Sequence, residues 1–287
     1  MDEFSGYVYS WSGFIDYIRC FHVVKPVWKI AGSLIWLGTA LSLLPQLLRI
    51  VQIRSSYGIS PMFVVLTSVS QFLVIMNMFC LHNADFVGAN QISMSRVIPR
   101  FLTFFNLFTL WYGYFPVILL LYVFFDMQPR EKRTREKFGI EKKEILLISV
   151  GFPIFCVVLY TFFHAMSIKH GYGSLLILGL GKSCGGIASI LALIHYIPQF
   201  VRTYNLKDHG SFSLLMLGIQ APGGLTNAMV MWIGQGEHWT TFTPMMLSAI
   251  QQFLLLGMCL YYKHIRNSNL NNHLLSDKIE PIRFTDV

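Results

Sequence analysis

Long apolar runs separated by short polar connections dominate the chain. Each run is about 20 or more residues long, which is enough to cross a hydrocarbon layer about 30 Å thick at 1.5 Å per residue. The pattern predicts seven membrane-spanning helices, at residues 30–53, 61–81, 101–125, 145–166, 183–204, 212–233 and 242–262. Two interpretations of the fifth are open, because Lys182 interrupts an apolar stretch that begins at Ser174. Either the helix is long and tilted, or residues 174–181 form a short interfacial segment.

The chain also contains an internal repeat. The segment Leu44-Pro-Gln-Leu-Leu-Arg49 matches Ile197-Pro-Gln-Phe-Val-Arg202 at an offset of 153 residues. Further positions agree at the same offset: Lys29 with Lys182, Gly32 with Gly185, Arg54 with Lys207, and Ser60 with Ser213. An isolated Pro-Gln pair carries no information, but agreement over some 30 residues at one offset indicates a true repeat.

The repeat predicts the helix arrangement. Each copy contains three helices, so tandem copies would cross the membrane in opposite directions unless an extra helix intervened. The span 145–166 has no counterpart and supplies that helix. We therefore expect an all-α membrane protein with seven transmembrane helices, built as a 3+1+3 parallel repeat of triple-helix bundles about an axis along the membrane normal.

The same plan divides the chain into five parts. These are a non-cytosolic N-terminal segment (1–29), a first bundle (30–126), a basic cytosolic loop with the linker helix and a luminal connection (127–182), a second bundle (183–263) and a flexible cytosolic tail (264–287).

Composition and charge support a membrane location. Hydrophobic residues make up 54% of the chain and charged residues 13%, against about a quarter charged in soluble domains, which excludes a water-soluble globule. The net charge is +8, but the basic residues gather in the connections, which indicates membrane topology and not nucleic-acid binding. The strongest cluster runs from Arg130 to Lys143. By the positive-inside rule it places the N-terminus in the lumen and the C-terminus in the cytosol.

Both Pro-Gln helix ends are followed by a basic residue, a short polar loop with glycine and a serine that starts the next helix. This pattern, over residues 30–262, resembles the PQ-loop repeat family of membrane proteins, relatives of the SWEET sugar porters and of cystinosin-type transporters. The resemblance implies export of small solutes, often amino acids, from lysosomes or vacuoles, sometimes with protons. The chain departs from the cystinosin-like members in having no Asp or Glu in spans five to seven, where Gln220 stands in place of an expected carboxylate.

The two motifs are candidate gating elements. Proline inside a helix removes a backbone hydrogen bond and clashes with the preceding turn. Pro45 and Pro198 are therefore predicted to be hinges near the cytosolic side, with Gln46 and Gln199 satisfying the freed backbone groups or bridging to another helix. The alternative is a static kink with no role in gating.

Polar side chains within the spans are candidates for a solute path, since such residues usually face the bundle interior. Asn77, Gln220, Asn227 and Gln251 are the first choices for substrate binding, because they lie away from the expected cytosolic ends. Further candidates are Gln71, Asn106, Gln252 and His195. For each one the alternative is an interhelical hydrogen bond worth roughly 0.6 to 2 kcal/mol.

His195 is the candidate proton carrier, because histidine titrates near neutral pH. The alternative is a neutral histidine bonded to a carbonyl. The expected partners are a small-molecule solute, the lipid bilayer and protons. No cofactor, metal or nucleic acid is expected, and the oligomeric state stays open.

The chain contains no HExxH, GxSxG or phosphate-binding motif, so we do not expect an enzyme. The function expected is alternating-access transport of a small solute, an amino acid above all, across a vacuolar, lysosomal or related endomembrane. A membrane receptor or sensor resembling the KDEL receptor is the alternative. A G-protein-coupled receptor is disfavoured, because such receptors are not built from two copies of three helices.

Overall fold

The computed structural model describes residues 26–83, 86, 94–125, 142–171, 174–208 and 210–279. Most of the expected luminal N-terminal segment, the basic cluster from Arg130 to Lys137, and the end of the tail lie outside these residues.

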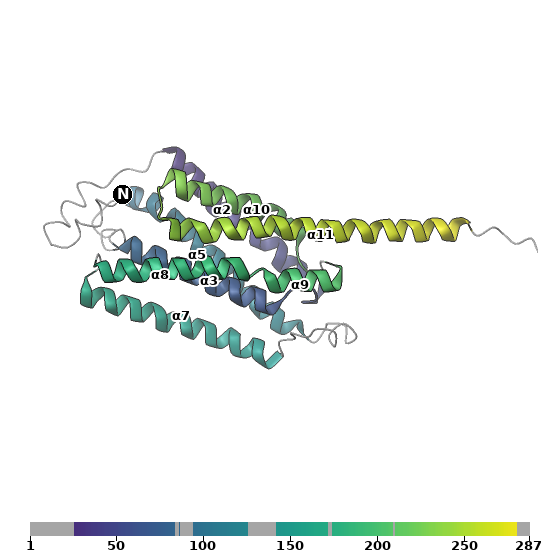
Figure 1. The fold of residues 1–287 in the computed structure, drawn as a ribbon, viewed down its shortest axis with the longest axis horizontal. Helices are drawn as coiled ribbons and strands as arrows, with labels where there is room; N and C mark the ends of the chain where they lie inside the picture. The colour runs from purple at the N-terminus through teal and green to yellow at the C-terminus, as the bar shows by residue number, and fades with distance from the viewer. Residues whose placement is uncertain are drawn as a thin grey trace, which may run out of the picture.

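The described chain is helical and contains no strand. Its elements are α2 (Pro26–Ile53), α3 (Pro61–Leu81), α5 (Met94–Val123), α7 (Lys142–His170), α8 (Leu175–Ile194), α9 (Ile197–Leu206), α10 (Leu214–Met229), the π-helical turn η4 (Val230–Gly234) and α11 (Trp239–Ile279). α8 with α9 and α10 with η4 each form one span, so the described residues provide seven helices long and apolar enough to cross a membrane. The predicted all-α, seven-span membrane fold is confirmed. In Figure 1 the helices run side by side, and α11 extends beyond the bundle at the α9 end.

The fifth span is helical from Leu175 onward. α8 begins at Leu175, and the Ser174 side chain caps it by accepting a hydrogen bond from the Ile177 amide at 3.4 Å. The helix continues through Lys182, which is exposed. The start predicted at residue 183 is therefore too late, and residues 175–181 belong to the helix, not to an interfacial segment.

The two prolines lie in different local structures. α2 runs unbroken past Pro45, whereas the fifth span is interrupted by a turn at His195 and Tyr196 before α9 begins. Pro198 lies in the first turn of α9, where its missing N–H has no intrahelical partner to lose. Of the two motif prolines, Pro45 alone therefore removes a hydrogen bond from a helix interior.

α3 is the central helix, because 78% of its apolar 18-residue stretch is buried inside the protein. The corresponding share for α7 is 17%. α3 packs on α8 through glycines: a Cβ at Gly181 would lie 2.5 Å from Cys80 Cβ, and a Cβ at Gly185 would lie 2.8 Å from Asn77 Nδ2 on α3 and 2.5 Å from the Thr240 carbonyl oxygen on α11. The Ser70 hydroxyl also donates to the Ala188 carbonyl at 3.1 Å. The α3–α8 seam thus joins the two halves at close range, while α7 lies at the edge against α3, α5 and α8.

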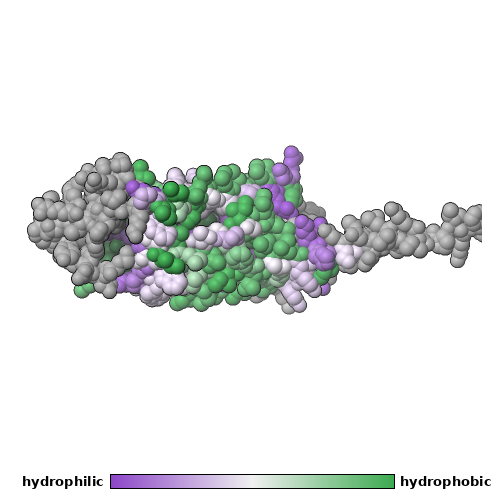
Figure 2. Space-filling view, turned by 90° about the horizontal axis from the view of Figure 1, so that it is seen from above, coloured by the Kyte–Doolittle hydropathy of each residue, from purple (hydrophilic) through white to green (hydrophobic). Residues whose placement is uncertain are grey.

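The outer surface suits lipid. Many large apolar side chains are exposed on α2, α7 and α8, among them Leu37, Leu147 and Ile190. Figure 2 shows an apolar belt between two more polar ends. The chain is therefore a multi-pass integral membrane protein. The described cysteines, Cys80, Cys156, Cys184 and Cys259, are buried and free, and Cys20 falls outside the described residues.

Candidate functional site

The two Pro-Gln motifs lie at the same end of the bundle, and each glutamine binds the loop that follows the other motif. Gln46 Oε1 accepts a hydrogen bond from the Ser213 amide at 2.8 Å, and its Nε2 donates to the Ser211 carbonyl at 3.2 Å. Gln199 Oε1 accepts from the Ser60 amide at 2.8 Å, and its Nε2 donates to the Gly58 carbonyl at 2.9 Å. Both glutamines are buried.

These bonds reach helix starts, because Ser60 and Ser213 are the N-caps of α3 and α10. The glutamine therefore satisfies a buried backbone N–H that helix geometry leaves without an intrahelical partner. We call Gln46, Gln199 and the described residues of the two loops, 54–60, 207–208 and 210–213, the Pro-Gln latch.

The two loops of the latch also contact each other directly. The Ser211 amide donates to the Tyr57 carbonyl at 2.7 Å, and the Arg49 guanidinium donates to the Gly210 carbonyl at 2.9 Å. Gly210 has a φ of +54°, and a Cβ there would lie 2.5 Å from the Tyr57 carbonyl oxygen. Only glycine allows the loops to come this close.

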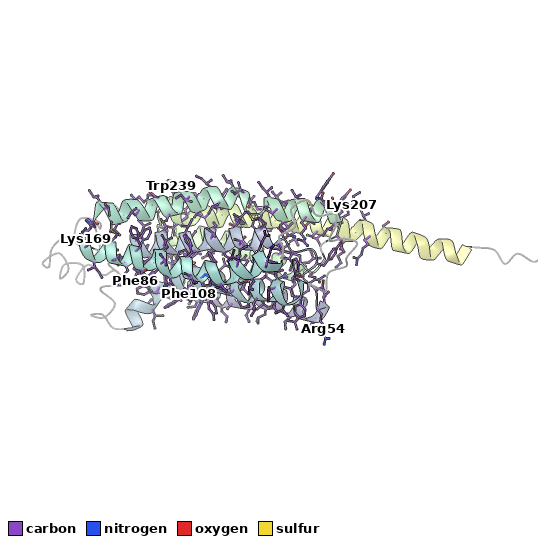
Figure 3. The ribbon with its side chains drawn as sticks, turned by 90° about the horizontal axis from the view of Figure 1, so that it is seen from below. Arg54, Phe86, Phe108, Lys169, Lys207 and Trp239 are labelled. Atoms are coloured by element: carbon purple, nitrogen blue, oxygen red, sulfur yellow. The ribbon has the colours of Figure 1, made fainter. Side chains whose placement is uncertain are left out.

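The latch is symmetric in backbone conformation too. Arg54 and Lys207, which correspond in the repeat, have φ values of 50° and 49° and end α2 and α9 in the left-handed region. Figure 3 shows both at one end of the bundle, with Lys169 at the other.

An aromatic cluster lies on the interior side of the latch. The Phe63 ring lies 4.8 Å from that of Tyr196 and 6.0 Å from that of Phe212, centroid to centroid. All three side chains are buried in one hydrophobic cluster with Tyr114 and Leu217. The cluster and the latch together close this end of the bundle.

A cavity of about 260 Å³ lies beyond the cluster, between the two halves. Residues of α2, α3, α5, α10 and α11, and of the α8–α9 junction, line it. The described lining residues include no Asp, Glu, Lys or Arg. Among the described lining residues, the cavity therefore carries a charge only when His195 is protonated.

Five buried polar side chains line the cavity, and each has an atom without a hydrogen-bond partner in the described structure. These atoms are Gln71 Oε1, Asn106 Oδ1, His195 Nε2, Gln220 Oε1 and Asn227 Nδ2. None of the five side chains belongs to a residue more than 7% exposed. Since a buried unpaired polar group costs about 1–3 kcal/mol, a ligand that pairs with several of them would gain that energy on binding.

The cavity brings together some of the predicted site residues. Gln220 and Asn227, the additional candidates Gln71, Asn106 and Gln252, and His195 all line it. Gln220 also donates from Nε2 to the Ser42 hydroxyl at 3.1 Å, which joins α10 to α2. These assignments remain predictions about solute contact.

Two other predicted residues do not reach the cavity. Asn77 Nδ2 donates to the Gly181 carbonyl at 2.9 Å and to the Thr240 hydroxyl at 3.0 Å, while its Oδ1 accepts from Thr241. Gln251 Nε2 donates to the Leu193 carbonyl at 2.9 Å. Both make the interhelical hydrogen bonds of the alternative interpretation.

His195 combines features of both interpretations. Its Nδ1 lies 3.0 Å from the Leu191 carbonyl oxygen. A carbonyl oxygen only accepts, so Nδ1 carries the proton and Nε2 is an acceptor when the ring is neutral. That acceptor is one of the five atoms without a partner.

Several lining residues are not predicted from the sequence, notably Tyr114 and the hydroxyl-bearing Thr39, Thr67 and Ser248. Thr67 and Ser248 donate to the carbonyls of Phe63 and Pro244, four residues earlier. Serine and threonine commonly do this in helices, so their presence in a span signals nothing specific.

Contacts between the halves also close the opposite end. His82 Nε2 lies 2.8 Å from Glu237 Oε2, and the Thr103 hydroxyl donates to Gln235 Oε1 at 2.5 Å. Gly234 packs so closely on Trp28 that a Cβ there would lie 2.6 Å from the indole ring. The two halves are therefore in contact at both ends of the bundle, with the cavity between these contacts.

The PQ loop repeat family model matches residues 27–87 and 180–239, one copy in each half. An uncharacterized protein of Schizosaccharomyces pombe is 36% identical over 84 residues. Those residues are 29% of this chain and 28% of that relative, so the chain matches less than a third of the relative's length.

Proposed function

The chain belongs to the PQ-loop repeat family, and we propose that it transports a small solute across a membrane through the cavity between its two repeats. One observation carries the proposal: five residues from both halves line one cavity, and each has a buried polar side-chain atom without a hydrogen-bond partner in the described structure. A purely structural bundle would pair these atoms with each other or with backbone groups, because unpaired polar groups in hydrocarbon are costly.

The mechanism proposed is alternating access. With the Pro-Gln latch closed at one end and the Thr103–Gln235 and His82–Glu237 contacts closed at the other, the structure corresponds to an intermediate between the two open states. Opening the latch separates the loops of the two repeats, and Pro45 and Pro198 are the hinges about which the bundles move. Gln46 and Gln199 then act as the gate bonds, since each crosses from one repeat to the other.

The location is proposed as a vacuolar or lysosomal membrane, with the N-terminus in the lumen and the C-terminus in the cytosol, and an amino acid is the first solute to test, as the resemblance to cystinosin-type transporters implies. The orientation is supported by the basic residues at the latch end, which include Arg49, Arg54, Lys207 and Arg266. Proton coupling is proposed for His195, which lines the cavity and whose Nε2 has no hydrogen-bond partner in the described structure.

Counterflow in proteoliposomes tests this function. The purified full chain is reconstituted, and uptake of a labelled panel of amino acids and of uncharged solutes is measured with and without a pH gradient. We expect uptake of at least one panel member over protein-free liposomes. Binding of a panel member without any flux would contradict transport and favour the KDEL-receptor-like alternative, in which the same cavity reads a ligand without releasing it across the membrane.

A further inference from the structure

Helices α2 and α10 touch at both ends of the bundle but separate between them. Near the latch, Gln46 bonds to Ser213, and Ser42 accepts from Gln220. At the other end Trp28 packs on Gly234. Between these contacts both helices carry a glycine that lines the cavity, Gly38 and Gly223, and a Cβ at either would meet no described atom within 4 Å.

The corresponding seam on the other side of the bundle is closed. In the repeat, α3 and α8 stand in the relation of α10 and α2, and there Gly181 and Gly185 allow contact so close that a Cβ would clash. Glycines in the α3–α8 seam therefore bring helices together, whereas those in the α2–α10 seam leave space. The seam between α2 and α10 is therefore the wider of the two and provides an opening to the cavity.

The opening faces the surface that lipid covers. Its rim includes Leu34, which is 64% exposed, Ile219, which is 39% exposed, and the exposed Thr226. Figure 2 is viewed from the side on which α10 and the start of α2 lie in Figure 1, and there the belt between the polar ends is largely apolar. A ligand that uses this opening enters from the hydrocarbon, while both water-facing ends are closed.

The interior of the cavity selects for an uncharged polar group. Gln71 Oε1, Asn106 Oδ1 and Gln220 Oε1 are acceptors without partners, so the ligand must donate hydrogen bonds. Asn227 Nδ2 is a donor that suits a hydroxyl or carbonyl oxygen. A phosphate or carboxylate would find no Lys or Arg among the described lining residues, and burying an unpaired ion is far more costly than burying a hydroxyl.

We infer that the cavity takes an uncharged amphiphile, whose hydroxyl-bearing head pairs with the buried amides and whose single apolar chain lies in the opening between α2 and α10. The inference rests on the proposed function, since the cavity is the same, and it replaces the zwitterionic amino acid with a neutral, partly apolar solute.

Photolabelling tests the site. The full chain in phosphatidylcholine liposomes is irradiated with a monoacylglycerol whose acyl chain carries a diazirine, and labelled peptides are identified by mass spectrometry. We expect labels on α2 and α10 around Gly38 and Gly223. The double substitution Gly38→Leu/Gly223→Leu fills the opening with side chains and is expected to lower that labelling by about tenfold.

Gly218→Leu is the matched control. Gly218 lies on the same helix and also has open space around it, but it does not line the cavity, so its labelling should equal that of the unaltered chain. Ile219→Trp, at the exposed rim, is a second blocking variant should the double substitution fail to fold. A lysophosphatidic acid with the same chain tests the head, and its labelling is expected to be about tenfold weaker because its phosphate lacks a cation.

Equal labelling of the blocked and unaltered chains, or equal labelling by the charged probe, would overturn the inference. So would labels spread evenly over α7, which marks ordinary lipid contact. Counterflow in the same liposomes separates this inference from the proposed function. Flux without monoacylglycerol labelling would contradict the side opening and leave the transport proposal intact. Selective labelling without any flux would contradict transport and leave the side opening intact.

Discussion

Gln46 and Gln199 make the same pair of hydrogen bonds in opposite directions across the bundle. Each side-chain oxygen accepts from the N-cap amide of the other repeat at 2.8 Å, Ser213 for Gln46 and Ser60 for Gln199. The glutamine thus holds the two repeats together at the end where the predicted hinges lie, and the proline beside it cannot move far without breaking these bonds.

Replacing either glutamine should loosen both loops of the latch. Gln46→Ala leaves the Ser213 amide and the Ser211 carbonyl without their partner, and Gln199→Ala does the same to Ser60 and Gly58. The cost of each is about 1–3 kcal/mol. Hydrogen exchange followed by mass spectrometry should show faster exchange in residues 54–60 and 207–213 with either variant.

The control for this experiment is Gln52→Ala, at an exposed position near the end of α2, which should leave the exchange of both loops unchanged. If Gln46→Ala and Gln199→Ala behave like that control, the hydrogen bonds do not hold the latch closed.

The two prolines should differ when replaced by alanine. Pro45→Ala restores a hydrogen bond inside α2 and should raise the unfolding temperature, since an interior proline costs up to about 3 kcal/mol in soluble helices. Pro198→Ala lies in the first turn of α9 and should change that temperature little. Both variants should slow transport in proteoliposomes if the prolines are hinges. Unaltered rates in variants that reach the membrane would rule the hinges out.

Asn77 and Asn227 should separate stability from solute binding. Asn77→Ala removes hydrogen bonds to Gly181, Thr240 and Thr241 and should lower the unfolding temperature markedly. Asn227→Ala removes an amide nitrogen that has no partner in the described structure, so stability should change little while the KM for the transported solute rises about tenfold. The opposite result, an unstable Asn227→Ala with an unaltered KM, would remove Asn227 from the site.

His195→Gln tests the proton carrier. Glutamine keeps a hydrogen-bonding group of similar length but does not titrate, so flux should continue while its response to a pH gradient disappears. His170→Gln, at an exposed position at the end of α7, should keep that response. A pH response that survives His195→Gln would assign the proton to another group.

The features that could be predicted from the sequence are those that follow from apolar runs and from internal repetition. Spans follow from the length of apolar runs, and the repeat follows from residues such as Pro45 and Pro198 that recur at one offset. The start of α8 is ambiguous in the sequence, because an exposed lysine at position 182 within a span resembles a helix end.

The role of each polar residue depends on which side of its helix the side chain occupies, and so on whether it contacts another helix or the cavity. Asn77 and Asn227 are equivalent in a sequence, yet one bonds to α8 and α11 and the other faces the cavity. The glycines show the same limit: Gly185 closes a seam and Gly38 leaves one open. Apolar length and internal repetition can be read from the order of residue types along the chain, whereas the rotation of each helix is set by three-dimensional packing against other helices, such as the Asn77–Gly181 contact. The spans and the repeat could therefore be predicted from the sequence. The latch partners, the cavity and its side opening could not, because they depend on that packing.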